Sequence, residues 1–474
     1  MKTCRSILAI FLFLALSGCA AVGPDYRPAP PAVPDKWTDQ AQAVPLSPED
    51  AAARVSWWAE FNDPVLSSLV EQAVSNNLDQ KIALARIREA RARAGIADAG
   101  LYPSATAQGS ETKRRSSESS GGGSENELWS AGFDASWELD LFGGTRRAME
   151  AAAADVAAAE FNHADVLVSL AAEVAKNYVN LRVYQARLDV AQRNLEIQRQ
   201  TLQIAQWRST AGLATDLDVE RASYQMQSTS ASLPQLSEQA RQTENALALL
   251  LGQAPGTLSD FLGTTGPVPK VPDQAAEGIP AELLSRRPDI RKAERDLAAQ
   301  TARIGAATAD LYPKISLNGN IGLSALEAGD LFQWKNRTYG FGPSISWNVF
   351  DAGAVRSNIE VQKALAQQAS LRYQQTVLSA LTDVENALAS FSRQQERLVH
   401  LRSAERSAAT ADELAAGEYA SGLSDITAVL DAEQARFSLE ESRVVCEGNI
   451  AQAVVGLYKA VGGGWNPDGM ALKK

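Results

Sequence analysis

One stretch of this chain is incompatible with a compact globular fold. Between Thr145 and Ala211 there is neither Pro nor Gly, the two residues that most often interrupt a helix. A continuous helix over these 67 residues would form a rod on the order of 100 Å long. Within it Val174, Leu181 and Leu188 recur every seven residues, which predicts a narrow apolar seam and a coiled-coil-like partner helix.

The chain also contains an internal duplication. The twelve residues 92–103 return as residues 302–313 with eight identities, at an offset of 210. The same offset carries Trp137 to Trp347 and Gly212 to Gly422. A period this long exceeds that of solenoid repeats, so the sequence predicts two copies of one large structural unit.

Proline marks the boundaries of these copies. Prolines cluster before residue 48 and again between residues 255 and 288. Each copy is expected to contain a helix, two strands and two long helices around a Gly-Leu turn. The predicted segments are a signal peptide at 1–18, an extended arm at 19–62, a first repeat at 63–252, a connector at 253–287, a second repeat at 288–462 and a tail at 463–474. The predicted strands are 104–113, 128–142, 314–324 and 337–350, and the predicted long helices are 145–211, 215–251, 353–420 and 424–461.

The N-terminus has the pattern of an export signal. Lys2 and Arg5 precede a short apolar run, and Leu16-Ser17-Gly18-Cys19 follows it. Small residues ending in Cys resemble a bacterial lipobox, which makes Cys19 the expected site of a covalent lipid and the first mature residue. No other cofactor is expected. An ordinary signal peptide with an incidental Cys is the alternative, and Cys446 is expected to be a small buried apolar residue.

Composition argues against several classes of function. After the N-terminus no apolar run approaches the roughly 18–20 residues of a membrane-spanning helix, so any membrane crossing must use strands. With 45 Lys and Arg against 56 Asp and Glu, the net charge of −11 disfavours nucleic acid as a partner. His163 and His400 lack nearby Cys or acidic ligand spacing, so no metal site, catalytic residue or enzyme activity is predicted.

The predicted strands alternate between apolar and polar residues in a way that is typical of membrane-spanning strands. From Trp129 to Leu141 every odd position is apolar, while every even position from 130 to 140 is polar or Gly. Residues 339–349 and 315–323 alternate likewise, over about the 9–11 residues of a tilted membrane strand. A water-soluble sheet with one buried face is the alternative. The expected membrane-facing anchors are Trp129, Phe133, Trp137, Tyr339 and Trp347.

Four strands cannot close a barrel, and open sheet edges are strongly unfavourable in lipid. The barrel must therefore be shared among chains. Two copies would give eight strands with a filled interior, whereas three copies give twelve strands and room for a lumen. The small polar residues on the inner face favour three copies.

Several motifs together match a known family. The lipobox, Gly23-Pro24-Asp25-Tyr26, the run Trp57-Trp58-x-x-Phe61-x-Asp63-Pro64-x-Leu66, Arg286-Arg287-Pro288-Asp289-Ile290 and the duplicated units resemble outer-membrane efflux factors of the OprM/NodT lipoprotein branch of the TolC superfamily. The resemblance implies mixed α and transmembrane β structure. It implies a homotrimer whose 12-stranded barrel continues into a long α-helical periplasmic tunnel. It also implies an adaptor protein and an inner-membrane pump as partners, and a lipid-anchored place in the bacterial outer membrane.

The resemblance also implies a gate at the periplasmic tip of the tunnel. Matching residue by residue places Asp218 in the first repeat and Tyr419 and Asp431 in the second at gate positions, with Asp425 as a substitute acid. Where some members carry a further acid, this chain has Ala428, which makes strong trapping of cations less expected. A carboxylate at these places is equally compatible with a solvated helix face or a helix N-terminus.

The predicted function is passive conduction of small toxic compounds or drugs out of the cell. Two other functions stay open at this point. One is a trimeric structural or adhesive envelope lipoprotein, and the other is the exit duct of a type I protein secretion system. Both strand pairs lie inside helical repeats, so rods and barrel must be coaxial, which favours a conduit.

Overall fold

The computed structural model describes residues 21–28, 44–45, 56–263, 265–271, 276–277 and 287–465. The predicted signal peptide, Cys19, most of the arm, part of the connector and most of the tail lie outside these residues. The chain divides into two compact units. We call the first the strand unit, which holds described residues of 1–29, 85–160 and 291–374, and the second the helix-pair unit, which holds those of 30–84, 161–290 and 375–474.

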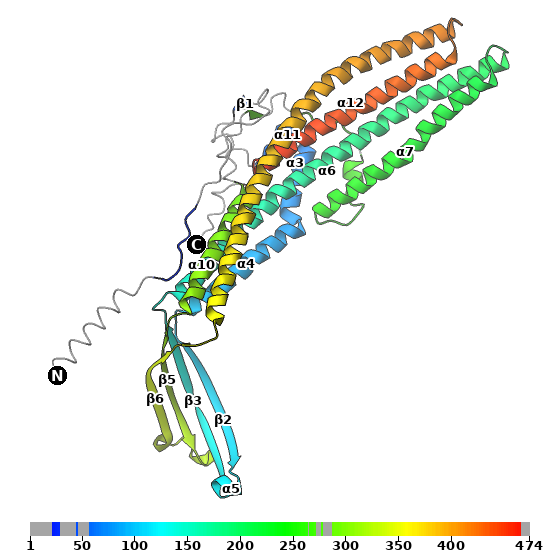
Figure 1. Cartoon of the computed structure of the whole chain (residues 1–474). Helices are drawn as coiled ribbons and strands as arrows, with labels where there is room; N and C mark the ends of the chain where they lie inside the picture. The colour runs from blue at the N-terminus through cyan, green and yellow to red at the C-terminus, as the bar shows by residue number, and fades with distance from the viewer. Residues whose placement is uncertain are drawn as a thin grey trace. The chain divides into compact units, whose positions relative to one another are not determined.

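The strand unit is built on one four-stranded antiparallel sheet with the order β2-β3-β5-β6 (Figure 1). Its strands are β2 (Ser104–Arg115), β3 (Glu125–Leu139), β5 (Lys314–Ala325) and β6 (Arg337–Ser346). The short helix α5 (Glu118–Gly121) joins β2 to β3, and two 3-10 turns, η2 (Ala328–Asp330) and η3 (Trp334–Asn336), join β5 to β6. The unit also contains α10 (Pro288–Ala309) from Arg291 onward and most of α4 (Leu78–Ala99).

Long helices dominate the helix-pair unit. It contains α7 (Asp216–Leu250), α12 (Ile426–Ala460) and the greater part of α6 (Gly144–Thr210) and α11 (Ala354–Ala420). In Figure 1 the α6–α7 and α11–α12 pairs each end in a tight turn. Within the described residues no helix is both long and apolar enough to cross a membrane. Small elements complete the unit: η1 (Trp57–Phe61), α3 (Pro64–Asn76), α8 (Ser259–Leu262), and β1 (Val44–Pro45) paired with β4 (Ala276–Glu277).

Corresponding elements of the two halves begin at a constant distance along the chain. The first residues of α4 and α10, of β2 and β5, of α6 and α11, and of α7 and α12 are each 210 positions apart, as 288 − 78 shows for the first pair. The turns match as well, because Gly212 and Gly422 both have positive φ, at 73° and 77°. Each ends a long helix in the left-handed conformation that only Gly adopts readily.

The observed strand ends correct two predictions. The strand predicted at 128–142 begins at Glu125 and ends at Leu139, because Asp140 instead accepts hydrogen bonds from the backbone N–H groups of Thr145 and Arg146 at the start of α6. The strand predicted at 337–350 ends at Ser346, and Asp351 plays the same capping role for α11. The other two strands each extend slightly beyond their predicted C-terminal ends, to Arg115 and Ala325.

The expectation of an extended arm through residue 62 is wrong at its C-terminal end. Residues 57–61 form η1, in which the side chains of Trp57, Trp58 and Phe61 are buried. Trp57 is only 1% exposed and stacks on Tyr458, with ring centroids 5.1 Å apart. The next residues form α3, a helix separate from α4 that was not predicted, with Asp63 as its N-cap.

Candidate functional site

The sheet has two chemically different faces. Phe133 of β3 lies between Ala107 of β2 and Ile321 of β5, and Ile321 in turn pairs with Tyr339 of β6. Because side chains directly opposite each other in a sheet share a face, these residues form one apolar surface. Phe133 is 62% exposed and Tyr339 71% exposed. An apolar face this open requires a non-aqueous environment or a partner.

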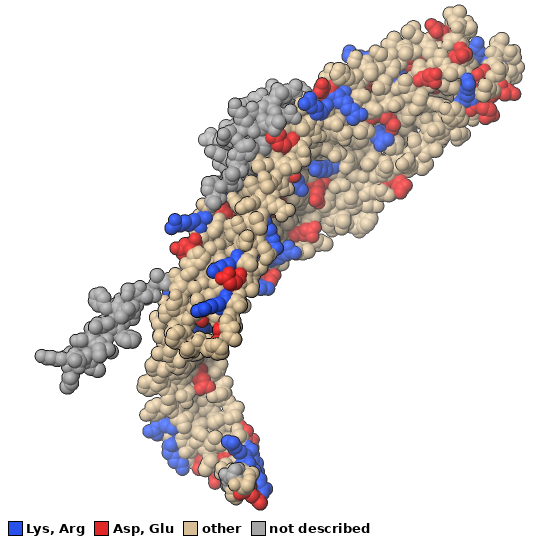
Figure 2. Space-filling model, viewed as in Figure 1, with Lys and Arg blue, Asp and Glu red and all other residues tan. Residues whose placement is uncertain are grey.

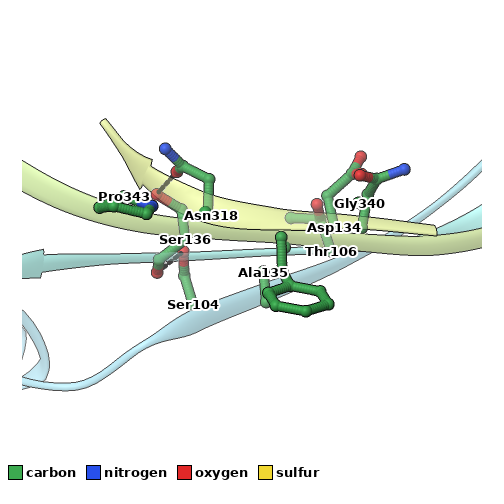
Figure 3. Close-up of a pocket in the computed structure, with 12 residues that line it drawn as sticks. Ser104, Thr106, Asp134, Ala135, Ser136, Asn318, Gly340 and Pro343 are labelled. Carbon is green, nitrogen blue, oxygen red and sulfur yellow. Dashed lines mark hydrogen bonds between the residues drawn. The ribbon is translucent and has the colours of Figure 1, made fainter. Parts of the chain in front are cut away.

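The opposite face is polar and is cross-linked by side-chain hydrogen bonds. Ser136 lies between Ser104 and Asn318 in the register. The Oγ of Ser136 donates to Oδ1 of Asn318 at 2.8 Å, and Nδ2 of Asn318 donates to Oγ of Ser344 at 2.8 Å. A shallow pocket with a volume of about 510 Å³ lies along this face (Figure 3). The polar groups that line it are Ser104, Thr106, Asp134, Ser136, Asn318 and Asn320.

Charged side chains gather at the end of the sheet that carries α5 (Figure 2). Arg115 of β2 and Glu125 of β3 pair across the hairpin there, 3.5 Å apart. Charged side chains at this end are favourably solvated by water, whereas the apolar side chains in the middle of the apolar face are not. Among the described residues, β2 pairs only with β3 and β6 only with β5 in this sheet, so both outer edges have unpaired backbone groups.

The predicted anchors lie mainly on the apolar face. Trp129, Phe133 and Trp137 lie four residues apart along β3 and therefore share one face, and Tyr339 lies on the same face. Trp347 lies just beyond β6 and is 56% exposed. The indole N–H groups of Trp137 and Trp347 donate to the carbonyl oxygens of Leu101 and Leu311, at 2.8 and 3.1 Å, in equivalent turns of the two halves. Both rings therefore have fixed positions where strands meet helices.

At the tips of the helix pairs, two of the predicted gate acids cap helices. Asp218 and Thr215 form a capping box at the start of α7, where Oδ2 of Asp218 accepts from the backbone N–H of Thr215 at 2.9 Å. The Thr215 hydroxyl donates to the same oxygen at 2.8 Å. The backbone hydrogen bond is the largest cause of the lowered pKa of Asp218, and the hydroxyl adds to it. Asp425 is the N-cap of α12 and accepts from the backbone N–H of Ala428. Both acids therefore have a structural role within the chain.

Tyr419 lies in the apolar core of the tip. It is 7% exposed and packs in a cluster with Ala205, Ala222, Ile426, Val429 and Leu430. The guanidinium of Arg208 lies 4.3 Å from the centre of its ring, and Arg208 also donates to the Tyr419 carbonyl oxygen. Burial raises the pKa of Tyr419, Arg208 opposes this shift, and Asp218 adds to it. Within the described residues the Tyr419 hydroxyl has no hydrogen-bond partner.

Asp431 caps no helix. It is exposed on α12 and lies one helical turn after Thr427. The structure thus brings Asp218 near Tyr419 and leaves Asp431 on the surface of the chain. Sequence reasoning missed Arg208, although a basic residue in the last turn of a long helix commonly bonds to nearby carbonyl groups. It also missed Arg221 of α7, which donates to Thr427 of α12 at 2.9 Å.

A buried acid lies farther along α12. Glu433 is 3% exposed, and the Thr201 hydroxyl of α6 donates to its Oε1 at 2.5 Å. Its Oε2 has no partner among the described residues. Burial is the largest effect on Glu433 and raises its pKa, with Asp412 adding to the shift. Arg436 pairs with Asp412 at 2.8 Å close by.

The structure does not assemble any conventional reactive centre from the described residues. No group of three or more His, Cys, Asp or Glu side chains there could hold a metal ion. His163 lies within hydrogen-bond distance of Gln80, at 3.4 Å, and burial lowers its pKa. Cys446 is buried, and its thiol contacts the carbonyl oxygen of Gln394 at 3.3 Å.

Comparison with known proteins gives consistent matches along the chain. A family model described as "Outer membrane efflux protein" matches residues 69–253 and again 279–463. Nodulation protein T of Rhizobium leguminosarum bv. trifolii is 34% identical over 96% of this chain and 97% of its own length. Pyoverdine export outer membrane protein OpmQ of Pseudomonas aeruginosa is 32% identical over 94% of each chain. The solved outer-membrane channel OprN superposes with a TM-score of 0.88 and 38% identity, over 94% of this chain and all of that one.

Proposed function

Because this chain belongs to the outer membrane efflux protein family, we propose that three copies of it form one channel through which small toxic compounds leave the cell. The family consists of transport channels and is not an enzyme family. The protein is accordingly the outer-membrane component of an efflux system. The main support for a channel formed by three copies is the four-stranded sheet, which has one apolar face, one polar face and two unpaired edges.

The two halves of the chain derive from one duplicated β-β-α-α unit. The equal spacing of their elements supports this, and so do the two matched ranges of the family model, which also begin 210 residues apart, as 279 − 69 shows. A duplicated unit contributes two hairpins and two helix pairs per chain. Three chains then provide six of each around one axis.

The chains assemble because the outer edges of β2 and β6 have unpaired backbone groups. Unpaired backbone groups in lipid cost several kcal/mol each, so each edge must pair with a neighbouring copy. Three copies close a barrel of about twelve strands, wide enough for a lumen. The apolar face with Phe133 and Tyr339 then contacts lipid, and the polar face with Ser136 and Asn318 lines the channel.

The mature chain is anchored by lipid on Cys19. The lipobox pattern supports this proposal, and the strands supply the membrane-spanning part independently of it. An adaptor protein and an inner-membrane pump deliver the substrate, since no nucleotide-binding motif is present in the sequence. The sheet therefore resides in the outer membrane and the helix pairs in the periplasm.

The tip residues Asp218, Tyr419, Asp425 and Asp431 form the gate. Threefold symmetry would bring three copies of Asp431, which is exposed, close to the axis, where the carboxylates repel each other and favour cations. The buried hydroxyl of Tyr419 lacks a partner within the described chain and is available to a neighbouring copy after a small rearrangement.

Neither alternative function is supported as well. A structural or adhesive lipoprotein needs no continuous polar face inside the sheet. A protein-secretion duct would share the architecture, but similar proteins carry names for nodulation, pyoverdine export and cation efflux.

Planar-bilayer recording of the purified full-length protein tests the proposal. We expect discrete, cation-favouring conductance steps from a protein that runs as three chains. A preparation that inserts but never conducts would contradict the channel and favour the structural alternative. To separate a closed tip from the absence of a lumen, the same recording is made with a variant lacking residues 200–225 and 410–435, the two tips.

A further inference from the structure

A polar pocket, which we call the three-helix pocket, lies between three helices of the helix-pair unit. Its volume is about 470 Å³, and it is lined by Lys176 of α6, by residues between 383 and 394 of α11 and by residues between 449 and 460 of α12. The apolar residues that line it are all small, such as Ala387 and Gly456, so no large apolar side chain fills the space. Pockets that bind small organic molecules have volumes of roughly 300–1,000 Å³.

The lining of the three-helix pocket has a net positive charge. Lys176 and Lys459 contribute two ammonium groups, and Asp383 is the one acid among the described residues that line it. Asp383 is engaged by Arg287, which donates to its Oδ2 at 3.3 Å and also pairs with Asp289. Within the part of the chain that the structure describes, neither lysine forms an ion pair or a hydrogen bond. The excess positive charge is opposite in sign to the net charge of the chain, which is −11.

A structural role explains only one of the two ammonium groups. Lys459 lies in the last turn of α12, where a cation complements the helix dipole. Lys176 lies in the middle of α6 and is partly buried, so its charge has no such compensation. Mutual repulsion and partial burial both raise the free energy of these charges, and an anion bound in the same pocket would lower it.

Amide and hydroxyl groups supply hydrogen-bond donors beside the lysines. Asn386 and Ser390 of α11 and Asn449 of α12 line the pocket. Gln394 lines it as well, and its Oε1 accepts from the Cys446 thiol at 3.4 Å, which leaves its amide N–H groups for another acceptor. Carboxylate and phosphate oxygens accept from ammonium and amide groups, and such charge-assisted hydrogen bonds are stronger than neutral ones.

We propose that the three-helix pocket binds a small organic anion with two or more carboxylate or phosphate groups. Lys176 and Lys459 bind its charged oxygens, and Gln394 and Asn449 donate to the remaining ones. The bound anion then links α6, α11 and α12, so its binding stabilises the helix-pair unit. This inference goes beyond the proposed conduction and does not depend on it, because binding needs neither an open tip nor a pump.

Calorimetric titration of the purified full-length protein with citrate, in detergent at low ionic strength, tests the proposal. We expect saturable binding whose affinity falls as NaCl is added, because salt screens the lysines. Lys176→Gln and Lys459→Gln should each weaken binding by about tenfold or more, since each removes a charge and keeps a long polar side chain. Lys363→Gln, which removes an exposed ammonium paired with Glu360, is the matched control and should leave the affinity unchanged.

A steric variant tests the position of the ligand without changing any charge. Gly456 lines the pocket, and a Cβ built on it would meet nothing within 4 Å, so a larger side chain there enters the pocket without a clash at its base. Gly456→Leu should abolish citrate binding. Gly417→Leu is its control, because Gly417 of α11 is equally open but does not line the pocket. Leu favours a helix over Gly at both positions, so only the ligand distinguishes the two variants.

Thermal unfolding with and without citrate gives a second readout. The midpoint should rise with citrate in wild type and in Gly417→Leu, and stay unchanged in Gly456→Leu. An equal rise in Gly456→Leu would mean that the anion binds elsewhere, and would overturn the assignment. Should Gly456→Leu fail to assemble, the two lysine variants still decide the question.

Three further outcomes would overturn the proposal. The first is a wild-type protein that does not bind citrate, and the second is equal weakening by Lys363→Gln, which would indicate non-specific attraction between charges. The third is tighter binding of inorganic phosphate than of citrate, which would exclude an organic ligand. A protein that binds citrate but never conducts would refute the proposed channel and leave this site intact.

Discussion

At the scale of single residues, the polar groups of the helix tips are first of all parts of the fold. Asp218 and Asp425 begin helices, and Tyr419 fills a core beneath Arg208. A variant that truncates Tyr419 would leave a cavity, and its effect on a channel would not separate lost packing from a lost gate. Useful substitutions must therefore remove a polar atom and keep the volume.

Tyr419→Phe meets that requirement, and Asp431→Ala can accompany it because Asp431 is exposed and its truncation leaves no cavity. Phe keeps the ring against Arg208, and Asp431 is exposed. The free energy of unfolding should therefore change by less than about 1 kcal/mol. If hydroxyl and carboxylate hold neighbouring copies together, single-channel conductance should rise and bulky antibiotics should enter. The control is a pair of changes in the β2–β3 hairpin, Ser117→Ala and Ser119→Ala, which should leave conductance unaltered. An unchanged double variant would locate closure in apolar packing around Val429.

The buried Glu433 predicts a pH dependence with a definite sign. Its pKa is raised in the folded state, so the unfolded chain releases this proton first as the pH rises above the ordinary value of 4.5. The contribution of Glu433 to stability should therefore fall as the pH rises from 4.5 toward the higher folded-state pKa, and stay low above it.

Glu433→Gln should remove this contribution and stabilise the protein by about 1 kcal/mol at neutral pH, because no charge is then buried. Thermal unfolding followed by circular dichroism between pH 5 and pH 8 measures the effect. Asp431→Asn, at an exposed position of the same helix, is the control for simple loss of charge. A wild-type protein that becomes more stable than Glu433→Gln as the pH rises would contradict the assignment.

At the scale of elements, alternation along the strands translates directly into two faces. From Ala131 onward, each apolar odd position of β3 meets an apolar or small residue in β2 or β5, whereas Trp129 lies opposite Glu111 of β2. Each polar even position from Ser130 to Glu138 meets another polar or small residue. The sheet of a single chain therefore already has one apolar face and one polar face.

A lysine scan of β3 tests which face contacts lipid. Phe133→Lys should reduce stability by roughly 2–4 kcal/mol if the site is near the bilayer midplane. Ser136→Lys, three residues away on the polar face, should be tolerated because its ammonium can reach water in the lumen. Unfolding of the protein by urea in lipid vesicles provides both values. Similar losses at the two sites would contradict the assigned faces.

At the scale of the whole molecule, we propose that further chains pair with the open edges of β2 and β6. Native mass spectrometry of the protein extracted in detergent should show three copies. Cys19→Ala should keep this mass, since the strands and not the lipid complete the sheet, and should shift the protein away from stable outer-membrane fractions. A monomeric Cys19→Ala protein would show that the lipid drives assembly.

Much of this architecture could be predicted from the sequence because its signals are local and repeated. The helix predicted at 145–211 differs from α6, Gly144–Thr210, by one residue at each end. Most of the alternating stretch at 129–141 lies in β3, Glu125–Leu139. Strand ends were harder to predict, because β3 ends at Leu139 and β6 at Ser346, short of the predicted 142 and 350. Asp140 and Asp351 accept hydrogen bonds from backbone N–H groups at the starts of the helices that follow, and neither is distinguished in the sequence from any other acid near a glycine.

The sequence by itself determined the long helices, the strands with their two faces and the family, because each depends on periodicity or on motifs that survive along one chain. Only the tertiary structure decided that η1 packs into a core, that Tyr419 is buried under Arg208, and that Arg147 holds residues 22–25. Those contacts join residues more than a hundred positions apart. Their free energy depends on burial and on distances between atoms, which no local pattern specifies.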